Sequence, residues 1–339
     1  MRDTKFNKKG VFTIKNIDII IPCYNSASTL PCTLASIAMQ SIKEQCNIYL
    51  CDDCGTDDYT EIINTFSSML DITYLRAEKN GGAGLTRQLG IDHSNNPYII
   101  FIDSDDTFYG SFAVEQLYNS IKNNYEIAYG NFVEELRIDD NLTQINHTPN
   151  ATWLHGKIFS REFLSKNNIR FAEFRLNEDG YFLQLAWNYL TKPNYINEPV
   201  YIWHNNKNSL VRNINDNLVR YKLLYSYIDV QISLYKEKLN RNIDNSSISL
   251  QQSVDALILL YFYFNEIFIE FGEEYGNEFI NKSIDFYKYV WNDIRLICKN
   301  TYLTERYASI LETNNFNQII PVMTLYDFVS TIKRLAVSK

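Results

Sequence analysis

The feature that most constrains the fold is a regular alternation of short apolar runs and helical patterns in the N-terminal third of the chain. Four apolar runs are rich in β-branched and aromatic residues and lack helical spacing, which predicts buried strands. These runs are Ile17–Ile21, Cys46–Cys51, Ile72–Arg76 and Tyr98–Ile102. The segments between them have helical spacing, at Ser28–Ser41, Tyr59–Met69 and Leu85–Ser94. This alternation predicts an α/β protein with a doubly wound, mostly parallel sheet flanked by helices.

The rest of the chain divides into a mixed part and a helical part. The mixed part has predicted helices at Phe112–Asn123, Arg161–Asn167 and Asp179–Leu190, and predicted strands at Ile127–Asn131, Gly156–Phe159 and Tyr195–Trp203. From Asn213 onward the pattern is helical, at Leu218–Leu239, Ile248–Glu270, Glu278–Lys299, Tyr302–Glu312 and Thr324–Leu335. We therefore expect one domain over residues 1–212 and a C-terminal helical region over 213–339, a size that allows a large core.

The composition is that of a soluble globular protein, with 45% hydrophobic and 21% charged residues. The net charge of −8 argues against a general nucleic-acid binder, because phosphate contacts need a basic surface. Met1–Lys15 is polar and basic, and no stretch reaches the roughly 18–20 apolar residues of a membrane span. We expect a cytoplasmic protein without a transmembrane segment, and a peripheral position at the inner membrane face stays open.

Five of the six cysteines lie before residue 55, and Cys51 and Cys54 have C-x-x-C spacing. A zinc site would need a second ligand pair, and none follows at a suitable distance. A redox pair is the other alternative, but the two aspartates between these cysteines would disfavour a thiolate. Free thiols in a reducing cytosol are the expectation.

Polar and acidic residues follow three of the predicted strands. These are Asn25, Asp52-Asp53 and Asp103-Ser104-Asp105-Asp106. Parallel strands bring their carboxyl ends to one edge of the sheet, which is where open α/β sheets bind ligands. Three acids within four residues repel one another unless a cation or strong donor is near, and Mg²⁺ or Mn²⁺ prefers such oxygen ligands. The alternative is a solvated acidic turn.

Four motifs in this order resemble glycosyltransferase family 2. They are Ile20-Ile21-Pro22-Cys23-Tyr24-Asn25, Cys51–Asp58, Asn80-Gly81-Gly82 with Arg87 and Gly90, and Ile102–Asp106. The resemblance implies the GT-A fold and a nucleotide-diphosphate sugar donor. It places the nucleotide-sugar half at about residues 1–110 and the acceptor half at about 111–212. The C-terminal helices lie outside it.

The resemblance assigns the base pocket to Pro22, Tyr24 and Asn25, with the Tyr24 ring stacked on uracil or another base. Asp53 would accept a hydrogen bond from the base imide. Gly82 lies in a loop that precedes a helix N-terminus, a setting that favours anions. Arg87 would contact the base or the diphosphate. The alternatives are a packing role for Tyr24 and a surface ion pair for Arg87.

The acidic motif would bind the ribose and the cation. The resemblance assigns Asp103 and Ser104 to the nucleotide, Asp103 and Asp105 to the metal, and Asp106 to the turn or the acceptor. His204 would be a metal ligand from the far side, although a lone histidine is more often structural. Arg212 or Lys207 would hold the diphosphate. The segment His155-Gly156-Lys157 is expected on the acceptor side of the site, and no firm role is assigned to it.

Glu178-Asp179 resembles the acid pair of the family. We expect Asp179 to be the general base that takes the proton of the acceptor hydroxyl, and Glu178 to orient the acceptor or the loop. The alternative is an acid pair at a helix N-terminus, where the helix dipole favours negative charge.

Together these features predict a metal-dependent, inverting glycosyltransferase that uses a UDP-sugar as donor. The predicted acceptors are a surface glycan or teichoic-type polymer, a lipid-linked precursor or a protein. Two alternatives are a phage-type enzyme that glycosylates a hydroxylated DNA base and a non-catalytic sugar-nucleotide-binding protein. A nucleotidyltransferase would need a different glycine-rich loop. The Tyr and Phe stripes of the C-terminal helices predict a core, and leave open a homo-oligomer surface or an acceptor dock.

Overall fold

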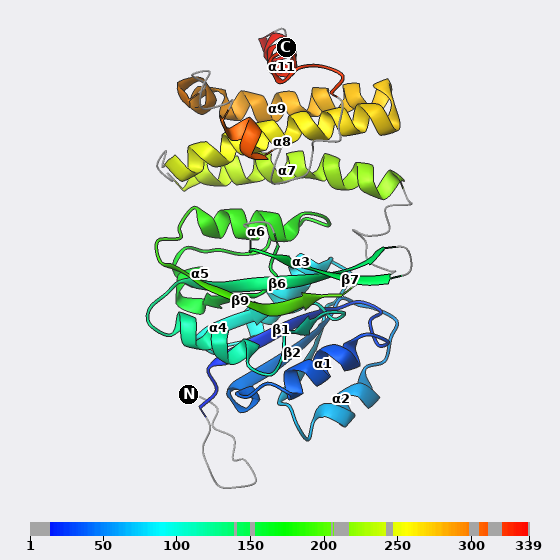
Figure 1. The fold of residues 1–339 in the computed structure, drawn as a ribbon, viewed down its shortest axis with the longest axis vertical. Coiled ribbons are helices and arrows are strands. Elements are labelled where there is room, and N and C mark those ends of the chain that lie inside the picture. The colour runs from blue at the N-terminus through cyan, green and yellow to red at the C-terminus, as the bar shows by residue number, and fades with distance from the viewer. Residues whose placement is uncertain are drawn as a thin grey trace. The chain divides into compact units, whose positions relative to one another are not determined.

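A computed structural model describes residues 14–138, 141–149, 153–204, 206, 217–241, 247–297, 305–310 and 321–337 (Figure 1). The chain divides into two compact units, Met1–Ser209 and Leu210–Lys339. The first unit contains the sheet and the second consists of helices.

The parallel part of the sheet comes from the N-terminal third of the chain. Strands β1 (Ile17–Cys23), β2 (Cys46–Asp52), β3 (Ile72–Arg76) and β4 (Tyr98–Phe101) pair in parallel in the order β3-β2-β1-β4. Helices α1 (Leu30–Ala38), α2 (Thr60–Phe66) and α3 (Ala83–His93) connect them, with a short 3₁₀ helix at Lys43–Gln45 before β2. The predicted doubly wound arrangement is therefore confirmed in this region.

The remainder of the nine-stranded sheet is mixed, in the order β4-β8-β6-β9-β5. Strand β8 (Lys157–Ser160) is antiparallel to both β4 and β6 (Ile127–Ile138), whereas β9 (Pro193–Trp203) runs parallel to β6 and antiparallel to β5 (Thr107–Phe108). Strand β7 (Asn141–His147) forms a hairpin with β6. The sequence predicted neither the length of β6 nor this hairpin, because β7 is exposed and polar and presents no apolar face to a core.

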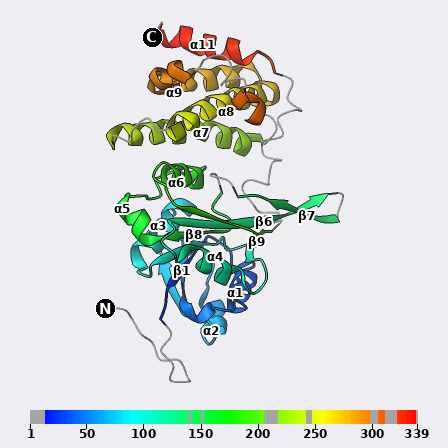
Figure 2. The same cartoon turned by 60° about the vertical axis from the view of Figure 1, so that its left-hand side comes forward.

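Helices cover both faces of the sheet (Figures 1 and 2). Helices α1, α2 and α4 (Ala113–Ile121) lie on one face, and α3, α5 (Arg161–Lys166) and α6 (Glu178–Trp187) lie on the other. Close packing on the second face depends on Gly90, where an added Cβ would lie 2.5 Å from Ile20 Cγ2. Both faces of β1, β2 and β4 are therefore buried, and the carboxyl edge of the parallel strands is left for the site.

The second unit contains α7 (Asn217–Asn240), α8 (Ser247–Phe271), α9 (Glu273–Ile297), a helix at 305–310 and α11 (Leu325–Val337). Its core is aromatic, and its buried rings include Tyr261, Phe264, Phe279, Phe286 and Phe328. The predicted core role of the aromatic stripes is confirmed by this burial. None of the helices in the described ranges is long and apolar enough to cross a membrane.

Candidate active site

The acidic turn follows β4 directly, and Tyr201 and His204 at the end of β9 hold it. The Tyr201 hydroxyl donates to Asp106 Oδ2 at 2.6 Å, and the His204 backbone N–H donates to Asp106 Oδ1 at 2.9 Å. Burial, reinforced by the charges of Asp105 and Asp103, raises the pKa of Asp106 well above its usual range. Asp106 therefore fixes the turn, one of the two roles predicted for it, and presents little surface to a substrate.

Arg87 connects the acidic turn to the start of α6. Its Nη2 lies 2.6 Å from Asp103 Oδ1, and its Nη1 lies 3.1 Å from Glu178 Oε1. The arginine is only 3% exposed. Burial would raise the pKa of Asp103, but the charges of Arg87 and His155 and the hydrogen bond from Arg87 together hold that pKa below its usual value. One buried guanidinium thus brings two motifs, distant in sequence, to a single site.

Asp179 follows Glu178 in the first turn of α6. Burial, and then the neighbouring Glu178 charge, raise the pKa of Asp179 to about 8, although Arg87 acts in the opposite direction. Lys157 lies on β8, is 1% exposed, and donates from Nζ to Trp153 O at 2.6 Å. Burial lowers the pKa of Lys157 to about 7, although the interaction with the Asp179 charge acts to raise that pKa. A carboxyl group with a raised pKa can serve as a general base at mildly alkaline pH.

The glycine loop before α3 is organised by Asp53. Its Oδ1 accepts from Gly81 N at 2.7 Å and its Oδ2 accepts from Gly82 N at 2.8 Å, while the side chain is buried. Gly82 has a φ of 87°, a conformation that favours glycine. At Gly84 an added Cβ would lie 2.8 Å from Glu178 Cγ, so a glycine is needed for α6 to approach. The predicted contact of Asp53 with a base stays a prediction.

Side-chain hydrogen bonds stabilise the loops after β1 and β2. Asn25, with a φ of 49°, accepts from Thr56 N at 2.7 Å through Oδ1. Asp52 is fully buried and accepts from Tyr74 OH at 2.8 Å and from Arg76. Tyr24, by contrast, is 55% exposed, so its ring is accessible for stacking. Pro22 is buried in β1 and Ser104 is half-buried in the acidic turn.

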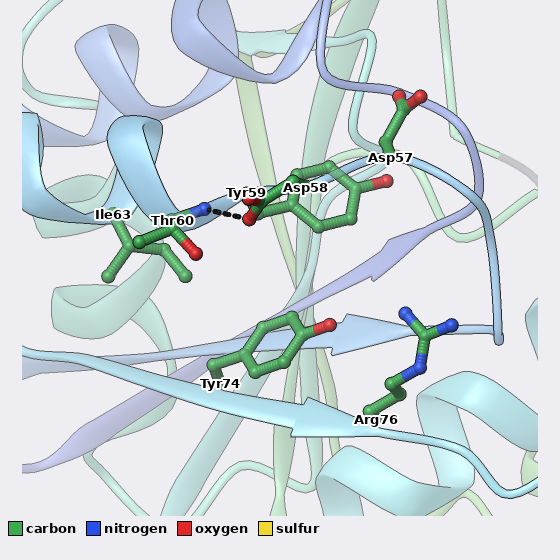
Figure 3. Close-up of a pocket in the computed structure, with 7 residues that line it drawn as sticks. All are labelled: Asp57, Asp58, Tyr59, Thr60, Ile63, Tyr74 and Arg76. Carbon is green, nitrogen blue, oxygen red and sulfur yellow. Dashed lines mark hydrogen bonds between the residues drawn. The ribbon is translucent and has the colours of Figure 1, made fainter.

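Figure 3 shows a cavity of about 270 Å³ beside this edge, and none of the predicted site residues lines it. Its walls are formed by Asp57, Asp58, Tyr59, Thr60, Ile63, Tyr74 and Arg76. The cavity therefore lies next to the buried Asp52 and is separate from the acidic turn.

Two histidines lie near the acidic turn. Ligand atoms of Asp103, Asp106 and His155 lie within 4.8 Å of one another, a group that could hold a cation. His204 has Nδ1 at 2.6 Å from Glu135 Oε2 and Nε2 at 2.7 Å from Thr107 Oγ1. Carboxylates with an imidazole are ligands that suit Mn²⁺ or Mg²⁺.

Two residues of this site, His155 and Glu135, were not predicted as site residues, and two predicted ones cannot be placed. His155 and Glu135 received no metal-related role from the sequence, because neither shows a recognisable ligand spacing. Arg212 and Lys207, the predicted diphosphate contacts, lie outside the described residues.

Comparison with known proteins identifies relatives of this chain in sequence and in fold. Residues 18–176 match the profile of glycosyl transferase family 2. A processive diacylglycerol β-glycosyltransferase of Mycoplasma pneumoniae is 25% identical over 263 residues, which cover 75% of this chain and 73% of the relative. The poly(ribitol-phosphate) β-N-acetylglucosaminyltransferase TarP of Staphylococcus aureus is 26% identical over 203 residues, which cover 54% of this chain and 62% of TarP. Of several other curated relatives the chain spans only 16% to 31% of the length.

Among solved structures, S. aureus TarS 1–349 in complex with UDP-GlcNAc superimposes with a TM-score of 0.63 at 16% identity. The superposition covers 95% of this chain and 92% of the TarS chain. This likeness shows a shared fold and confirms the predicted GT-A architecture. Over residues 18–176, just under half of its length, this chain is similar to glycosyl transferase family 2.

Proposed function

We propose that this protein is a metal-dependent, inverting glycosyltransferase that moves a hexosyl or N-acetylhexosaminyl group from a UDP-sugar to a hydroxyl acceptor. The observation that carries the proposal is the buried Arg87, which joins Asp103 of the acidic turn to Glu178 beside Asp179. Donor-binding acids and a candidate base thereby share one site.

The carboxyl edge of the parallel strands provides the donor side. The backbone of Gly81 and Gly82 leads into the N-terminus of α3, where anions are favoured. Tyr24 offers an exposed ring for a base. The choice of a UDP-sugar is supported by the shared fold with TarS, whose structure contains UDP-GlcNAc.

A divalent cation would be held by Asp103 and Asp105 with a histidine as a further ligand. It would offset the negative charge that develops on the leaving diphosphate. Burial, and then repulsion from Asp103, raise the pKa of Asp105, which fits a carboxylate whose natural partner is a cation.

In the chemical step, Asp179 acts as the base, and the acceptor oxygen attacks the face of the sugar opposite the leaving diphosphate. Asp179 takes the proton of the acceptor hydroxyl, and the oxygen attacks the anomeric carbon from the face opposite the diphosphate. The bond from the anomeric carbon to the diphosphate oxygen breaks, and its electron pair leaves with UDP. Displacement from the opposite face inverts the anomeric configuration.

Two acceptor classes are supported by different relatives. The similarity to TarP favours a polyol-phosphate polymer of the teichoic type. The similarity to the diacylglycerol β-glycosyltransferase, which extends over more of both chains, favours a lipid hydroxyl as the second candidate.

The test is UDP release from a panel of UDP-sugars with Mn²⁺, in parallel with poly(ribitol phosphate) and with diacylglycerol vesicles as acceptors. We expect release with one donor to rise when one acceptor is added and to stop when EDTA is added. Release that EDTA leaves unchanged would contradict metal dependence. UDP binding without turnover of any donor would favour the non-catalytic alternative.

A further inference from the structure

Both ring nitrogens of His204 are held by side chains from other elements. Nδ1 lies 2.6 Å from Glu135 Oε2 on β6, and Nε2 lies 2.7 Å from Thr107 Oγ1 on β5. A carboxylate next to one ring nitrogen attracts the ring proton to that nitrogen. The proton therefore belongs on Nδ1, and Nε2 presents its lone pair to the Thr107 hydroxyl.

His204 is joined to the acidic turn through its backbone and through Thr107. The His204 backbone donates to Asp106 at 2.9 Å, and Asn206 Nδ2 donates to Asp105 Oδ2 at 2.8 Å. Thr107, which touches Nε2, follows Asp106 directly in the chain. The His204 side chain also keeps 31% of its surface exposed, so a ligand can reach it.

The alternative group of Asp103, Asp106 and His155 is less suited to an ion. Both oxygens of Asp106 already accept hydrogen bonds, from Tyr201 and from the backbone of His204. The His155 ring is buried and stacked on Tyr201, with 4.8 Å between the centroids. The His204 ring, by contrast, keeps 31% of its side-chain surface exposed, and its Nε2 is bound to one hydroxyl.

We propose that Glu135 is a positioning residue, which orients His204 so that Nε2 completes the cation site with Asp103 and Asp105. The inference rests on the proposed function, because it requires that the enzyme bind a cation. A carboxylate that holds the second nitrogen of a metal-binding histidine fixes the ring and strengthens its lone pair. The Thr107 hydroxyl would give up its bond to Nε2 when the ion binds.

The chain contains a matched control for this pair. Glu134, the neighbour of Glu135 on β6, has Oε2 at 2.8 Å from His147 Nε2. That ring stacks on Phe132 with 4.9 Å between the centroids, and no described contact joins it to the acidic turn. The two pairs have the same chemistry on one strand, and among the described contacts only the Glu135–His204 pair is joined to the acidic turn.

The test is a Mn²⁺ titration of the full chain in the presence of UDP, with free Mn²⁺ measured by electron paramagnetic resonance. Loss of such an orienting group typically lowers metal affinity about 10–100-fold. We expect that loss in Glu135→Gln and an unchanged affinity in Glu134→Gln. Thr107→Val should bind Mn²⁺ more tightly than the wild type, because Nε2 no longer has to release a hydroxyl.

Equal Mn²⁺ affinity in Glu135→Gln and the wild type would overturn the inference, as would an equal loss in Glu134→Gln. If circular dichroism shows that Glu135→Gln does not fold, the Mn²⁺ affinity of Thr107→Val is the test. Weaker Mn²⁺ binding in Thr107→Val than in the wild type would then overturn the inference. A wild type that binds UDP but no Mn²⁺ would contradict metal dependence itself, and the wild-type titration alone reveals that outcome.

Discussion

The parallel strands β1–β4 and the mixed strands β5–β9 belong to one sheet, but they contribute to the site in different ways. The parallel part supplies backbone groups and acids that bind one another. An example is Asp53, whose carboxylate accepts hydrogen bonds from the Gly81 and Gly82 amides. In the mixed part, the Tyr201 side chain and the His204 backbone bind Asp106 of the acidic turn. Glu178 of α6 binds Arg87, which in turn binds Asp103. The comparison suggests that the first part holds the donor and the second part performs the chemistry.

The strongest test of this division is Asp179→Asn, a nearly isosteric change in α6. Loss of a general base typically lowers the rate about 10²–10⁴-fold. We expect a loss of that size in the transfer rate at saturating donor, with UDP affinity unchanged by calorimetry. Weaker UDP binding with a normal saturated rate would place Asp179 on the donor side, and Glu178 would then be the next candidate base.

The converse test is Asp53→Ala in the parallel part. The variant leaves the half-buried Gly81 and Gly82 amides without their acceptor, and an unmade hydrogen bond of this kind typically costs about 1–3 kcal/mol. We expect weaker UDP binding of that order and a transfer rate at saturation close to that of the wild type. Asp58→Ala is the control, because among the described contacts the Asp58 carboxylate hydrogen-bonds only with Thr60. Equal UDP affinities in Asp53→Ala and the wild type would remove the loop from the donor site.

The pH dependence tests the mixed part separately. A base must be deprotonated to accept a proton, and the pKa of Asp179 is raised to about 8 by burial. The value of kcat/KM should therefore rise with pH below about 8, up to about tenfold per pH unit, and level off above it. Asp179→Asn should lose this dependence. A wild-type profile that is flat from pH 6 to pH 9 would contradict the assignment.

The smallest effect is expected where the two parts meet on the surface. Arg175, in the segment before α6, donates from Nη2 to Asn80 O at 2.8 Å and also contacts the Asn80 side chain. Because these contacts are exposed, Arg175→Ala should weaken UDP binding by only about 0.5–1.5 kcal/mol. Arg170→Ala, which removes another exposed arginine paired with Asp92, serves as the control in the same calorimetric titration. A loss as large as that of Asp53→Ala would mean that the two parts are not separate.

The two parts also differ in how far the sequence predicted them. The parallel strands, their helices and the glycine loop follow from local patterns, because strand and helix periodicities and turn residues act over a few positions. Arg87 was predicted as a nucleotide contact, but its bond to Glu178 spans 91 positions and has no local signal. The same holds for Glu135 and His204, which only the antiparallel and parallel pairings of the mixed part bring together. The β7 hairpin was missed because its residues do not build a core.

The central claim is that the donor binds at the carboxyl edge of the parallel strands, next to the acidic turn. Hydrogen–deuterium exchange with and without UDP and Mn²⁺ tests it directly. We expect slower exchange at the loop of residues 80–84 and at the Asp103–Asp106 turn, with little change at Thr60, Tyr74 and Arg76 around the neighbouring cavity (Figure 3). Protection of that cavity, with the loop and the turn unchanged, would contradict it.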